Sequence, residues 1–464
     1  MKVLSTIKKE FDVAIIGSGT GGYPGAIYLA QKGLKVAVIE ENLTGGECTN
    51  YGCVPSKAIY QFAESIRTLK NISANSSYEW EKLIEWADNS VKGVRNGIES
   101  LFDSYDNIAY FKGKGVLKAK NKISIIEENN SEIDAKNVIL ATGTDPSKIP
   151  VADFDKKGII SNREVFSLKE KPNSMLIVGG GVIGVELANM FSSLGIQTYL
   201  VELKERILPF LDKDVSQAIK GYLVEKGVKV MERTSLKGVS KVSENYQVLL
   251  SNDEKLEVDK VIISTGRSPK TKNIGLENLG IKIDERGFIK VNEKLETNVS
   301  GIYATGDVVG GPLLAHKAII ESISAAKWIS ENNGFHVDYY SIPQVIFSGL
   351  EIAWIGMGEN ELNSKGINYE KIKLPIYYLA AVRIRNERRS FIKLLLDKEN
   401  KKIYGIEIVA PHASEVISSY LPLYLNKITI EEASKITYPH LTVSESIRDI
   451  AEYLLGEPIH MIKK

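Results

Sequence analysis

Cysteine is almost absent from this chain, which has only 2 cysteines among 464 residues. This scarcity excludes the disulfide-rich scaffolds of small secreted proteins. Cys48 and Cys53 stand five residues apart, so a disulfide between them would close a loop of about six residues and constrain the unfolded chain little. We interpret them as a labile pair that cycles between dithiol and disulfide in a reducing compartment. The alternative is two buried free cysteines that lie close by chance.

An excess of one charge and a long apolar run are also missing. The 59 Lys and Arg residues nearly balance the 58 Asp and Glu residues, and the formal net charge is +1. Such a balance favours neither nucleic acid nor a membrane surface as a partner. No stretch approaches the roughly 18–20 apolar residues of a membrane span, and residues 1–10 lack the apolar core of a signal peptide. We therefore expect a soluble, cytoplasmic protein of about three domains, and we assign no metal site.

Two parts of the chain, roughly 160 residues apart, follow the same strand–helix–strand order. In the first part, short apolar runs predict buried parallel strands over residues 11–16 and 35–40, with a helix over 22–32 between them. In the second, the strands are expected over 175–178 and 198–202 and the helix over 185–194. The sequence therefore predicts two nucleotide-binding units of one plan.

A glycine-rich turn joins strand to helix in both parts, and an acidic residue ends the second strand. Glycines let the backbone approach a pyrophosphate at the helix N-terminus, and the carboxylate can hold a ribose hydroxyl. The predicted dinucleotide-binding residues are Gly17, Gly19, Gly22 and Glu40 in the first part and Gly179, Gly181, Gly184 and Glu202 in the second. Glu202 would accept from a free 2′-hydroxyl and repel a 2′-phosphate, which favours NAD over NADP. Lys204 and Arg206 follow it closely, and we interpret them as a solvated charged turn.

The remaining segments carry weaker signals. Residues 80–102 place apolar side chains, from Trp80 to Leu101, at helical spacing, which predicts a packed amphipathic helix. From about Tyr340 onward, strand-like runs such as 391–396 mix with helices, which indicates a separate α+β domain. Four arginines gather in that domain, at 383, 385, 388 and 389. We interpret them as a solvated hairpin, with a docking surface for an acidic partner as the alternative.

The cysteine segment itself resembles a known signature. Gly-Gly-Glu-Cys48, four residues, then Cys53-Val-Pro-Ser-Lys57 is similar to the active-site segment of the FAD-dependent pyridine nucleotide–disulfide oxidoreductases. The resemblance covers essentially the whole chain and implies an α/β fold with two Rossmann-like domains, for FAD and NAD, and a C-terminal α+β dimerisation domain. It implies FAD-binding parts over residues 1–148 and 268–340, an NAD-binding domain over 149–267 and an interface domain over 341–464.

The resemblance also implies a role for each residue near the cysteines. Cys53 would be the flavin-proximal sulfur, and Cys48 the interchange thiol that meets the substrate. Lys57 and Glu186 would form an ion pair near the flavin. Further cofactor-binding positions would be Gly46, Thr142, Gly143, Gly266, Asp307 and Ala315, with residues 141–143 and 264–267 as two domain-crossing strands.

The choice of family member rests on two smaller features. Residues 314–318, Leu-Ala-His-Lys-Ala, are most similar to dihydrolipoamide dehydrogenases, and Val182 takes the position where glutathione reductases carry a gating tyrosine. The implied reaction is dihydrolipoamide + NAD⁺ = lipoamide + NADH, in a homodimer, with a free or protein-bound lipoyl substrate and a 2-oxoacid dehydrogenase complex as an implied partner. The alternatives are an NAD(P)H-dependent reductase of another small disulfide, glutathione reductase-like, and a mercuric reductase-like enzyme.

The segment near the C-terminus departs from the family pattern. His440 would be the general base contributed by the partner subunit, and Glu445 would orient its imidazole. Leu441 replaces the usual proline, whose preceding peptide bond is typically cis, so the loop must position His440 in another way. The same motif, residues 439–442, also resembles mercuric reductases. Residues 459–464 carry no cysteine and no extra metal-binding domain precedes residue 11, so we expect no mercury reduction.

Overall fold

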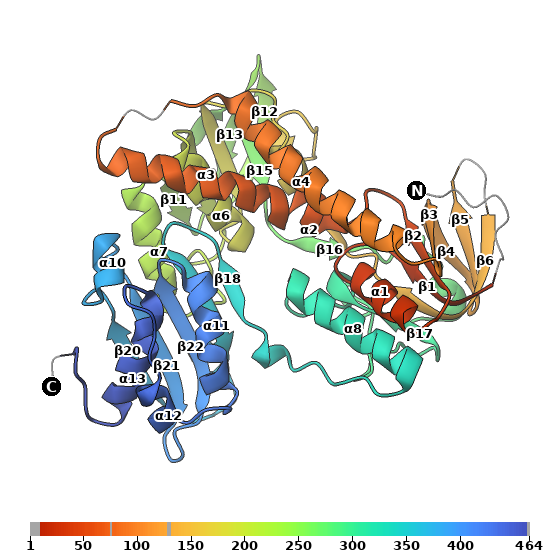
Figure 1. Ribbon diagram of the computed structural model, residues 1–464. Coiled ribbons are helices and arrows are strands. Elements are labelled where there is room, and N and C mark those ends of the chain that lie inside the picture. Colours follow the sequence, from red (N-terminus) through yellow and green to blue (C-terminus); the bar gives the residue numbers. More distant parts are fainter. Residues whose placement is uncertain (1–9, 75–76, 128–130, 462–464) are drawn as a thin grey trace.

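The computed structural model describes residues 10–74, 77–127 and 131–461 (Figure 1). Residues 1–9, on which the prediction about a signal peptide bears, lie outside this part of the chain. The predicted α/β class is confirmed, with three sheet-based units: one at the N-terminal end of the chain, one in its middle and one at its C-terminal end.

The first unit is built on a seven-stranded sheet. Its strands are β1 (Glu10–Ile16), β2 (Val36–Glu40), β3 (Ile108–Lys112), β4 (Lys114–Ala119), β5 (Lys122–Ile126), β6 (Ser131–Leu140) and β17 (Ile302–Ala304). The order is β3-β2-β1-β6-β5-β4, and β17 pairs with β6 in parallel. Every residue of β2 is buried, as expected for a parallel strand covered on both faces. Because β17 joins from a distant part of the chain, this unit is discontinuous in sequence.

Helices cover this sheet and extend from it. α1 (Tyr23–Gln31) packs against α8 (Ala315–Glu331), where a Cβ on Gly25 would lie only 2.7 Å from Ser322 Oγ. α2 (Gly46–Tyr51), α3 (Cys53–Asn71) and α4 (Trp80–Asp103) follow β2, and α3 and α4 lie side by side (Figure 1). The helix predicted over 80–102 is confirmed, but its apolar face is narrower than predicted. Val94 and Leu101 are 43% and 44% exposed, because the helix packs against its neighbours along one side only.

The second unit repeats the plan of the first. Its main sheet has the order β11-β10-β9-β15-β8, from β8 (Ile159–Ile160), β9 (Ser174–Val178), β10 (Gln197–Glu202), β11 (Lys229–Glu232) and β15 (Lys260–Ile263). A smaller antiparallel sheet contains β12 (Leu236–Val242), β13 (Asn245–Leu250) and β14 (Lys255–Val258). Its helices are α5 (Asn162–Val165), α6 (Val182–Ser193) and α7 (Lys213–Glu225). α6 begins at Val182, not at 185 as predicted, because the extended backbone of the glycine turn ends at Gly181.

A two-stranded ribbon connects the first two units. β7 (Thr144–Pro146) continues the chain after β6, and β16 (Arg267–Pro269) continues it after β15. The two short strands pair antiparallel, with Arg267 opposite Pro146 and Pro269 opposite Thr144. We call this pair of strands the crossing ribbon. It begins where the predicted domain-crossing segments, residues 141–143 and 264–267, end, and it shares only Arg267 with them.

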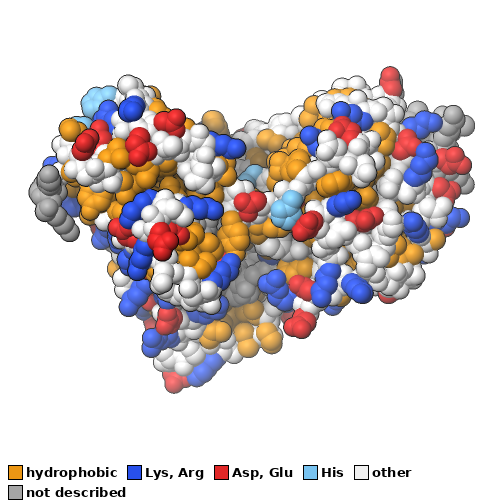
Figure 2. Space-filling model, turned by 90° about the horizontal axis from the view of Figure 1, so that it is seen from below, with side chains coloured by type: hydrophobic (Ala, Val, Ile, Leu, Met, Phe, Trp, Pro, Cys, Tyr) orange, Lys and Arg blue, Asp and Glu red, His pale blue; other side chains and the backbone are white. Residues whose placement is uncertain are grey.

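The third unit is the antiparallel sheet at the C-terminal end. Its order is β18-β19-β22-β21-β20, from β18 (Gln344–Ile346), β19 (Glu351–Gly356), β20 (Tyr369–Pro375), β21 (Phe391–Asp397) and β22 (Ile403–Ala410). Five helices accompany it: α9 (Glu359–Ser364), α10 (Ala380–Ile384), α11 (Ala413–Tyr424), α12 (Ile430–Lys435) and α13 (Ser446–Leu454). Seen from below, hydrophobic side chains gather on this unit, and the surface is hollowed between it and the first unit (Figure 2).

The arginine cluster of this unit is not a hairpin, and that prediction is wrong. Arg383 belongs to α10, and the other three arginines follow that helix in the turn that leads to β21. Arg383 and Arg388 lie against the ring of Tyr377, and Arg389 pairs with Glu225 of the second unit. A nearby aromatic ring and a nearby carboxylate thus account for three of the four cations.

A buried ammonium group joins the second and third units. Lys393 on β21 is fully buried, and its Nζ lies 2.5 Å from Asp212 and Glu407, 2.9 Å from Asp214 and 3.1 Å from Glu359. Asp212 and Asp214 come from the start of α7, whereas Glu359 and Glu407 belong to the third unit. Burial raises the pKa of Glu407 to about 8 against the opposing charge of Lys393, and the charge of Asp212 adds to the rise.

The pKa of Glu407 makes stability fall as the pH rises. Between about pH 4.5 and pH 8 the folded protein keeps a proton on Glu407 that the unfolded chain has lost. The free energy of unfolding should therefore decrease across this window. Glu407→Gln removes the titrating group, so we expect the urea unfolding midpoint of this variant to change less between pH 5 and pH 8 than that of the wild type.

The matched control for this measurement is Glu370→Gln. It makes the same change from carboxyl to amide in an exposed ion pair with Lys401. It should keep the pH dependence of the wild type. Equal pH slopes for Glu407→Gln and the wild type would contradict a protonated Glu407 in the folded protein.

Candidate active site

The two glycine turns hold their acidic residues in the same way. In the first unit, Glu40 Oε2 accepts from Ser18 N at 2.8 Å and Oε1 accepts from Asn42 N at 2.8 Å. In the second unit, Glu202 Oε2 accepts from Gly180 N at 2.7 Å and Oε1 accepts from Lys204 N at 2.8 Å. Each carboxylate is therefore fixed by backbone amides at the end of its strand, with lone pairs left for a ligand.

The first glycine of each turn has a backbone that other residues rarely adopt. Gly17 has φ +109° and Gly179 has φ +110°. A Cβ on Gly17 would lie 2.2 Å from the carbonyl oxygen of Ala141, and one on Gly179 would lie 2.6 Å from that of Ser264. Both contacts are with the residue just beyond a strand, β6 in the first unit and β15 in the second, where the segment to the crossing ribbon begins. Only glycine fits these positions.

A cavity of about 1380 Å³ brings most of the predicted residues together. It is larger than the roughly 300–1,000 Å³ of an ordinary small-molecule pocket, which suits a ligand as long as a dinucleotide. The predicted residues in its lining are Gly17, Gly19, Glu40, Gly46, Cys48, Cys53, Lys57, Thr142, Gly143, Glu186, Asp307 and Ala315. Gly22 lies behind the first turn, Gly179, Gly181, Gly184 and Glu202 form the second turn outside the lining, and Gly266 directly precedes the crossing ribbon.

The two cysteines lie on successive helices, and their thiols are near enough to shift each other's pKa in opposite directions. Cys48 is in α2, and Cys53 is the first residue of α3. The neighbouring Cys53 raises the pKa of Cys48, and burial raises it further. The pKa of Cys53 is lowered by the neighbouring Cys48 and by the positive charge of Lys57. Cys53 is surrounded by protein but open to the cavity, so its thiolate faces the space where a ligand fits.

Lys57 and Glu186 form an ion pair that reaches across units. Lys57 Nζ on α3 lies 2.7 Å from Glu186 Oε2 on α6. The second carboxylate oxygen accepts from the backbone N–H of Phe347 at 2.9 Å, and Lys57 Nζ lies 4.5 Å from the centre of the Phe347 ring. Phe347 directly follows β18, so all three units contribute to this pair.

Asp307 lies at the opposite wall, on the 3₁₀ turn η2 (Gly306–Val309). Burial raises the pKa of its carboxyl, while Lys317 and Arg267 oppose that rise. Thr144 Oγ1 donates to it at 3.3 Å. A carboxylate with one long hydrogen bond, facing a cavity, fits a ligand that carries several hydroxyl groups. The residues present therefore fit a flavin dinucleotide.

The loop that carries Asp307 is held by a buried pair on α8. Lys317 and Glu321 are fully buried and lie 3.0 Å apart. Lys317 Nζ donates to the carbonyl oxygens of Gly306 and Gly310, and Glu321 accepts from Gly306 N and from the hydroxyl of Tyr339. Sequence reasoning did not identify this pair, since a Lys and a Glu four residues apart usually mark a solvated helix face.

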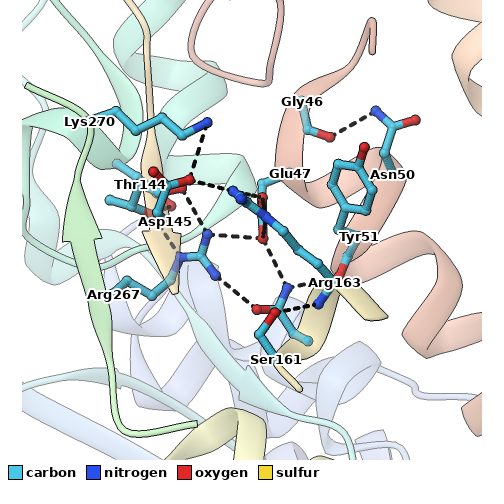
Figure 3. Close-up of polar contacts among 12 residues, drawn as sticks. Gly46, Glu47, Asn50, Tyr51, Thr144, Asp145, Ser161, Arg163, Arg267 and Lys270 are labelled. Atoms are coloured by element: carbon cyan, nitrogen blue, oxygen red, sulfur yellow. Dashed lines mark hydrogen bonds and ion pairs between the residues drawn. The ribbon is translucent and has the colours of Figure 1, made fainter. Parts of the chain in front are cut away.

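A charged cluster beside Cys48 was also missed by sequence reasoning (Figure 3). Glu47 accepts from Arg163 Nη2 at 2.8 Å and forms an ion pair with Arg267, whose Nη2 lies 3.0 Å from Glu47 Oε1. Asp145 accepts from Arg163 at 2.7 Å and lies 3.3 Å from Lys270. Burial opposes ionisation of Glu47, but Arg163 and Arg267 outweigh it and hold the pKa of the carboxyl below its usual value. Four of these residues lie outside the cysteine motif, so only the fold brings them to it.

His440 and Glu445 stand apart from the cavity. His440 Nδ1 lies 2.9 Å from Glu445 Oε1, and the His440 side chain is 76% exposed. Glu445 Oε2 also accepts from Thr442 N, and Thr442 Oγ1 donates to Pro439 O. These bonds fix the loop around Leu441 without a cis peptide bond, and none occurs among the described residues. Neither residue lines the cavity of its own chain.

No helix in the described part of the chain has the length and the apolar character that a membrane crossing requires.

Comparison with known proteins assigns both parts of the chain to one protein family. The family model "Pyridine nucleotide-disulphide oxidoreductase" matches residues 11–322, and the model of that family's dimerisation domain matches residues 342–451.

Individual relatives match over nearly the whole chain. The chain is 34% identical to "Dihydrolipoyl dehydrogenase 2, mitochondrial" of Arabidopsis thaliana, over 97% of this chain and 91% of that protein. It is 34% identical to dihydrolipoyl dehydrogenase of Trypanosoma brucei brucei, over 96% of each. Among solved structures, the Cu(II) complex of the HOCl-induced flavoprotein disulfide reductase RclA from Escherichia coli matches with a TM-score of 0.88 at 25% identity, over 96% of this chain and 99% of that one. This chain therefore belongs to the pyridine nucleotide-disulphide oxidoreductase family.

Proposed function

We propose that this protein is a flavoprotein that oxidises a dihydrolipoyl dithiol and reduces NAD⁺, with FAD as its resident cofactor. The observation that carries the proposal is the pair of neighbouring thiols, both in the lining of a cavity that also contains a dinucleotide fingerprint. The relatives named dihydrolipoyl dehydrogenase, at 34% identity over almost the full chain, support this choice of substrate. The lipoyl group can be free or carried by a 2-oxoacid dehydrogenase complex.

We assign FAD to the large cavity and NAD to the second glycine turn. Gly17, Gly19 and Glu40 would hold the adenosine and pyrophosphate end, and Asp307 the ribityl chain. The flavin, when bound, supplies two-electron transfer between a dithiol and a nicotinamide. We propose the domain division 1–148 and 268–340 for FAD, 149–267 for NAD and 341–464 for the dimer. The pairing of β17 with β6 supports the two-part FAD domain.

The cysteines would carry out thiol exchange in two steps. The first substrate thiolate attacks Cys48 of the disulfide and releases Cys53 as a thiolate. The second substrate thiol then attacks the mixed disulfide, which frees Cys48 and leaves the substrate as a cyclic disulfide. Two electrons and one proton go on to NAD⁺, and one proton is released. Lys57 stabilises the Cys53 thiolate through its charge, as the lowered pKa of Cys53 indicates.

The general base would come from the second subunit of a homodimer. His440 and Glu445 do not line the cavity of their own chain, but they are exposed and paired. Large apolar side chains are exposed in the same unit: Leu425, Ile436, Leu441, Leu455 and Ile459. Burying them between two copies would place His440 of one subunit at the cysteines of the other. The chain's use of both cysteines as a redox pair, rather than as structural staples, supports a cytoplasmic location.

The first prediction concerns the reaction itself. The purified protein should oxidise dihydrolipoamide with NAD⁺ and prefer NAD⁺ over NADP⁺ by about tenfold to a hundredfold, because Glu202 bonds a 2′-hydroxyl and repels a 2′-phosphate. Arg206 donates to the carbonyl oxygens of Pro209 and Leu211, which supports the view that it is not free to bind a phosphate. Steady-state kcat/KM with both nucleotides measures the preference, and Glu202→Ala should narrow it.

The controls for this assay are glutathione and other small disulfides with NADH and NADPH. Faster turnover of one of these substrates than of the lipoyl substrate would contradict the proposed function. Equal kcat/KM with the two nucleotides would contradict the role of Glu202.

The second prediction concerns the two sulfurs. The protein should purify yellow, and two-electron reduction should give a long-wavelength absorption band from the Cys53 thiolate beside the flavin. Cys48→Ser should show the band without reduction, since Cys53 is then a free thiolate, and Cys53→Ser should lack it. Absorption spectra of both variants, recorded with and without dithionite, test the assignment, and unchanged spectra in both would refute it.

The third prediction concerns the shared site. A dimer with Cys48→Ser in one subunit and His440→Ala in the other keeps one site with both residues intact, so it should show about half the wild-type activity per dimer. Each homodimeric variant should be nearly inactive with the dithiol. Purifying the mixed dimer with two affinity tags permits the measurement. If the cysteines and His440 act within one chain, the mixed dimer will remain inactive, and the role assigned to the C-terminal unit will be wrong.

A further inference from the structure

Glu47, the residue before Cys48, is held by the second unit and by the crossing ribbon. Its carboxylate accepts from Nε and Nη2 of Arg163 at 3.0 and 2.8 Å and from Asn162 Nδ2 at 2.9 Å, both on α5. Arg267 of β16 adds a contact at 3.0 Å. Figure 3 shows Arg163 and Arg267 gathered around the Glu47 carboxylate. A bidentate arginine fixes both the position and the orientation of a carboxylate.

The same two residues of α5 contact the other end of α2. Asn162 Nδ2 also donates to the carbonyl oxygen of Tyr51, the last residue of α2, at 3.0 Å. The guanidinium of Arg163 lies 5.8 Å from the centre of the Tyr51 ring. α5 therefore contacts α2 on both sides of Cys48, at Glu47 and at Tyr51.

α2 needs such support, because its own hydrogen bonds are few. It has 6 residues, begins after Gly45 and has no side-chain cap at its N-terminus. So short a helix is not stable alone. Asn50 holds it from the side of the first unit, where Nδ2 donates to the carbonyl oxygens of Thr44 and Gly46. Glu47 is its charged anchor on the side of the second unit.

We propose that Glu47 is a positioning residue for the interchange thiol: clasped by Arg163 and Arg267, it fixes α2 against the NAD-binding unit and so keeps the sulfur of Cys48 in place for thiol exchange. This inference rests on the proposed function and adds a residue to its machinery. It explains why a short helix between two flexible glycines can hold a reactive sulfur. Small displacements of a reacting group lower rates strongly.

Charged groups face the cysteines from several elements. Lys57 on α3 lowers the pKa of both thiols, Glu186 on α6 raises that of Cys53, and Cys48 raises the pKa of Tyr23, the first residue of α1. The cluster around Glu47 adds charges of both signs, from Arg163, Arg267, Asp145 and Lys270. In the proposed dimer, His440 of the partner subunit joins them and is the same in every variant described below.

The effects of substituting Glu47 and Arg163 can be distinguished, because the two side chains carry charges of opposite sign. Glu47→Gln and Arg163→Gln break the same contact and loosen the same helix. The first leaves guanidinium charge near the thiols without its counter-charge, so the thiol pair should ionise at lower pH. The second removes one of the three positive charges and leaves the two carboxylates balanced by Arg267 and Lys270, so the pair should ionise at higher pH. If these residues only held the helix together, both substitutions would shift the pH midpoint of thiol ionisation in the same direction.

The experiment uses the FAD-loaded dimer with the cysteines reduced. The rate of alkylation by iodoacetamide, followed as a function of pH, gives the midpoint at which the thiols ionise. We expect the midpoint to fall by about half a pH unit in Glu47→Gln and to rise by a similar amount in Arg163→Gln. The double variant should return close to the wild type, while all three variants should lose about tenfold in dihydrolipoamide turnover.

Arg163→Lys separates position from charge. It keeps the positive charge but loses the bidentate geometry, so its midpoint should match the wild type while its turnover with dithiol falls. Glu132→Gln, which removes an exposed carboxylate (52% exposed) from β6, is the matched control and should change neither quantity.

Three results would overturn the proposal. These are an unchanged midpoint in both single variants, a shift of both midpoints in the same direction, and full dithiol turnover in Glu47→Gln. Failure of the wild type to oxidise dihydrolipoamide would instead contradict the proposed function, and the alkylation midpoints would still test the role of Glu47. Should Glu47→Gln fail to fold, the comparison of Arg163→Gln with Arg163→Lys carries the same test.

Discussion

The two sulfurs can meet only because the helix between them breaks at Gly52. In a continuous helix, residues five apart point about 140° away from each other. Here α2 ends at Tyr51 and α3 begins at Cys53, with Gly52 between them at φ −127° and ψ −108°. A Cβ on Gly52 would lie 3.2 Å from the Glu47 carbonyl oxygen and 3.3 Å from Cys48 Cα. This break brings the two thiols near enough for each to shift the pKa of the other in opposite directions, and the proposed exchange chemistry depends on that difference.

Several buried charges join the units around that break. Glu186 connects Lys57 of the first unit with the backbone of the third, and Lys393 joins the third unit to the second. Buried ions are costly unless they are paired, and removal of one partner leaves a charge with no compensation. These contacts therefore fix the three units relative to one another. As a result, the cavity that the units line keeps its shape. Glu47 extends the same principle to the short helix that carries Cys48.

Local features of the chain were predictable because they depend on interactions between residues that are close in the sequence. The glycine turns, their strands and the acidic residues Glu40 and Glu202 could be placed from the sequence, since a tight turn and a strand end are set by neighbouring residues. Errors arose where packing decides the outcome. Val94 and Leu101 continue an apolar period but remain partly exposed, and the arginines near 385 lie at the end of a short helix and in the turn after it rather than in a hairpin.

The amino-acid sequence by itself determined the neighbouring cysteines, the two glycine turns and the family resemblance, because each depends on short runs of residues. Only the tertiary structure decided which distant charges meet those runs. Arg163 lies 116 residues from Glu47, and Glu186 lies 129 residues from Lys57. Nothing in the local pattern of an Arg or a Glu distinguishes a solvated side chain from a buried partner. That difference is decided when the crossing ribbon and the three units bring the residues together and remove the water between them.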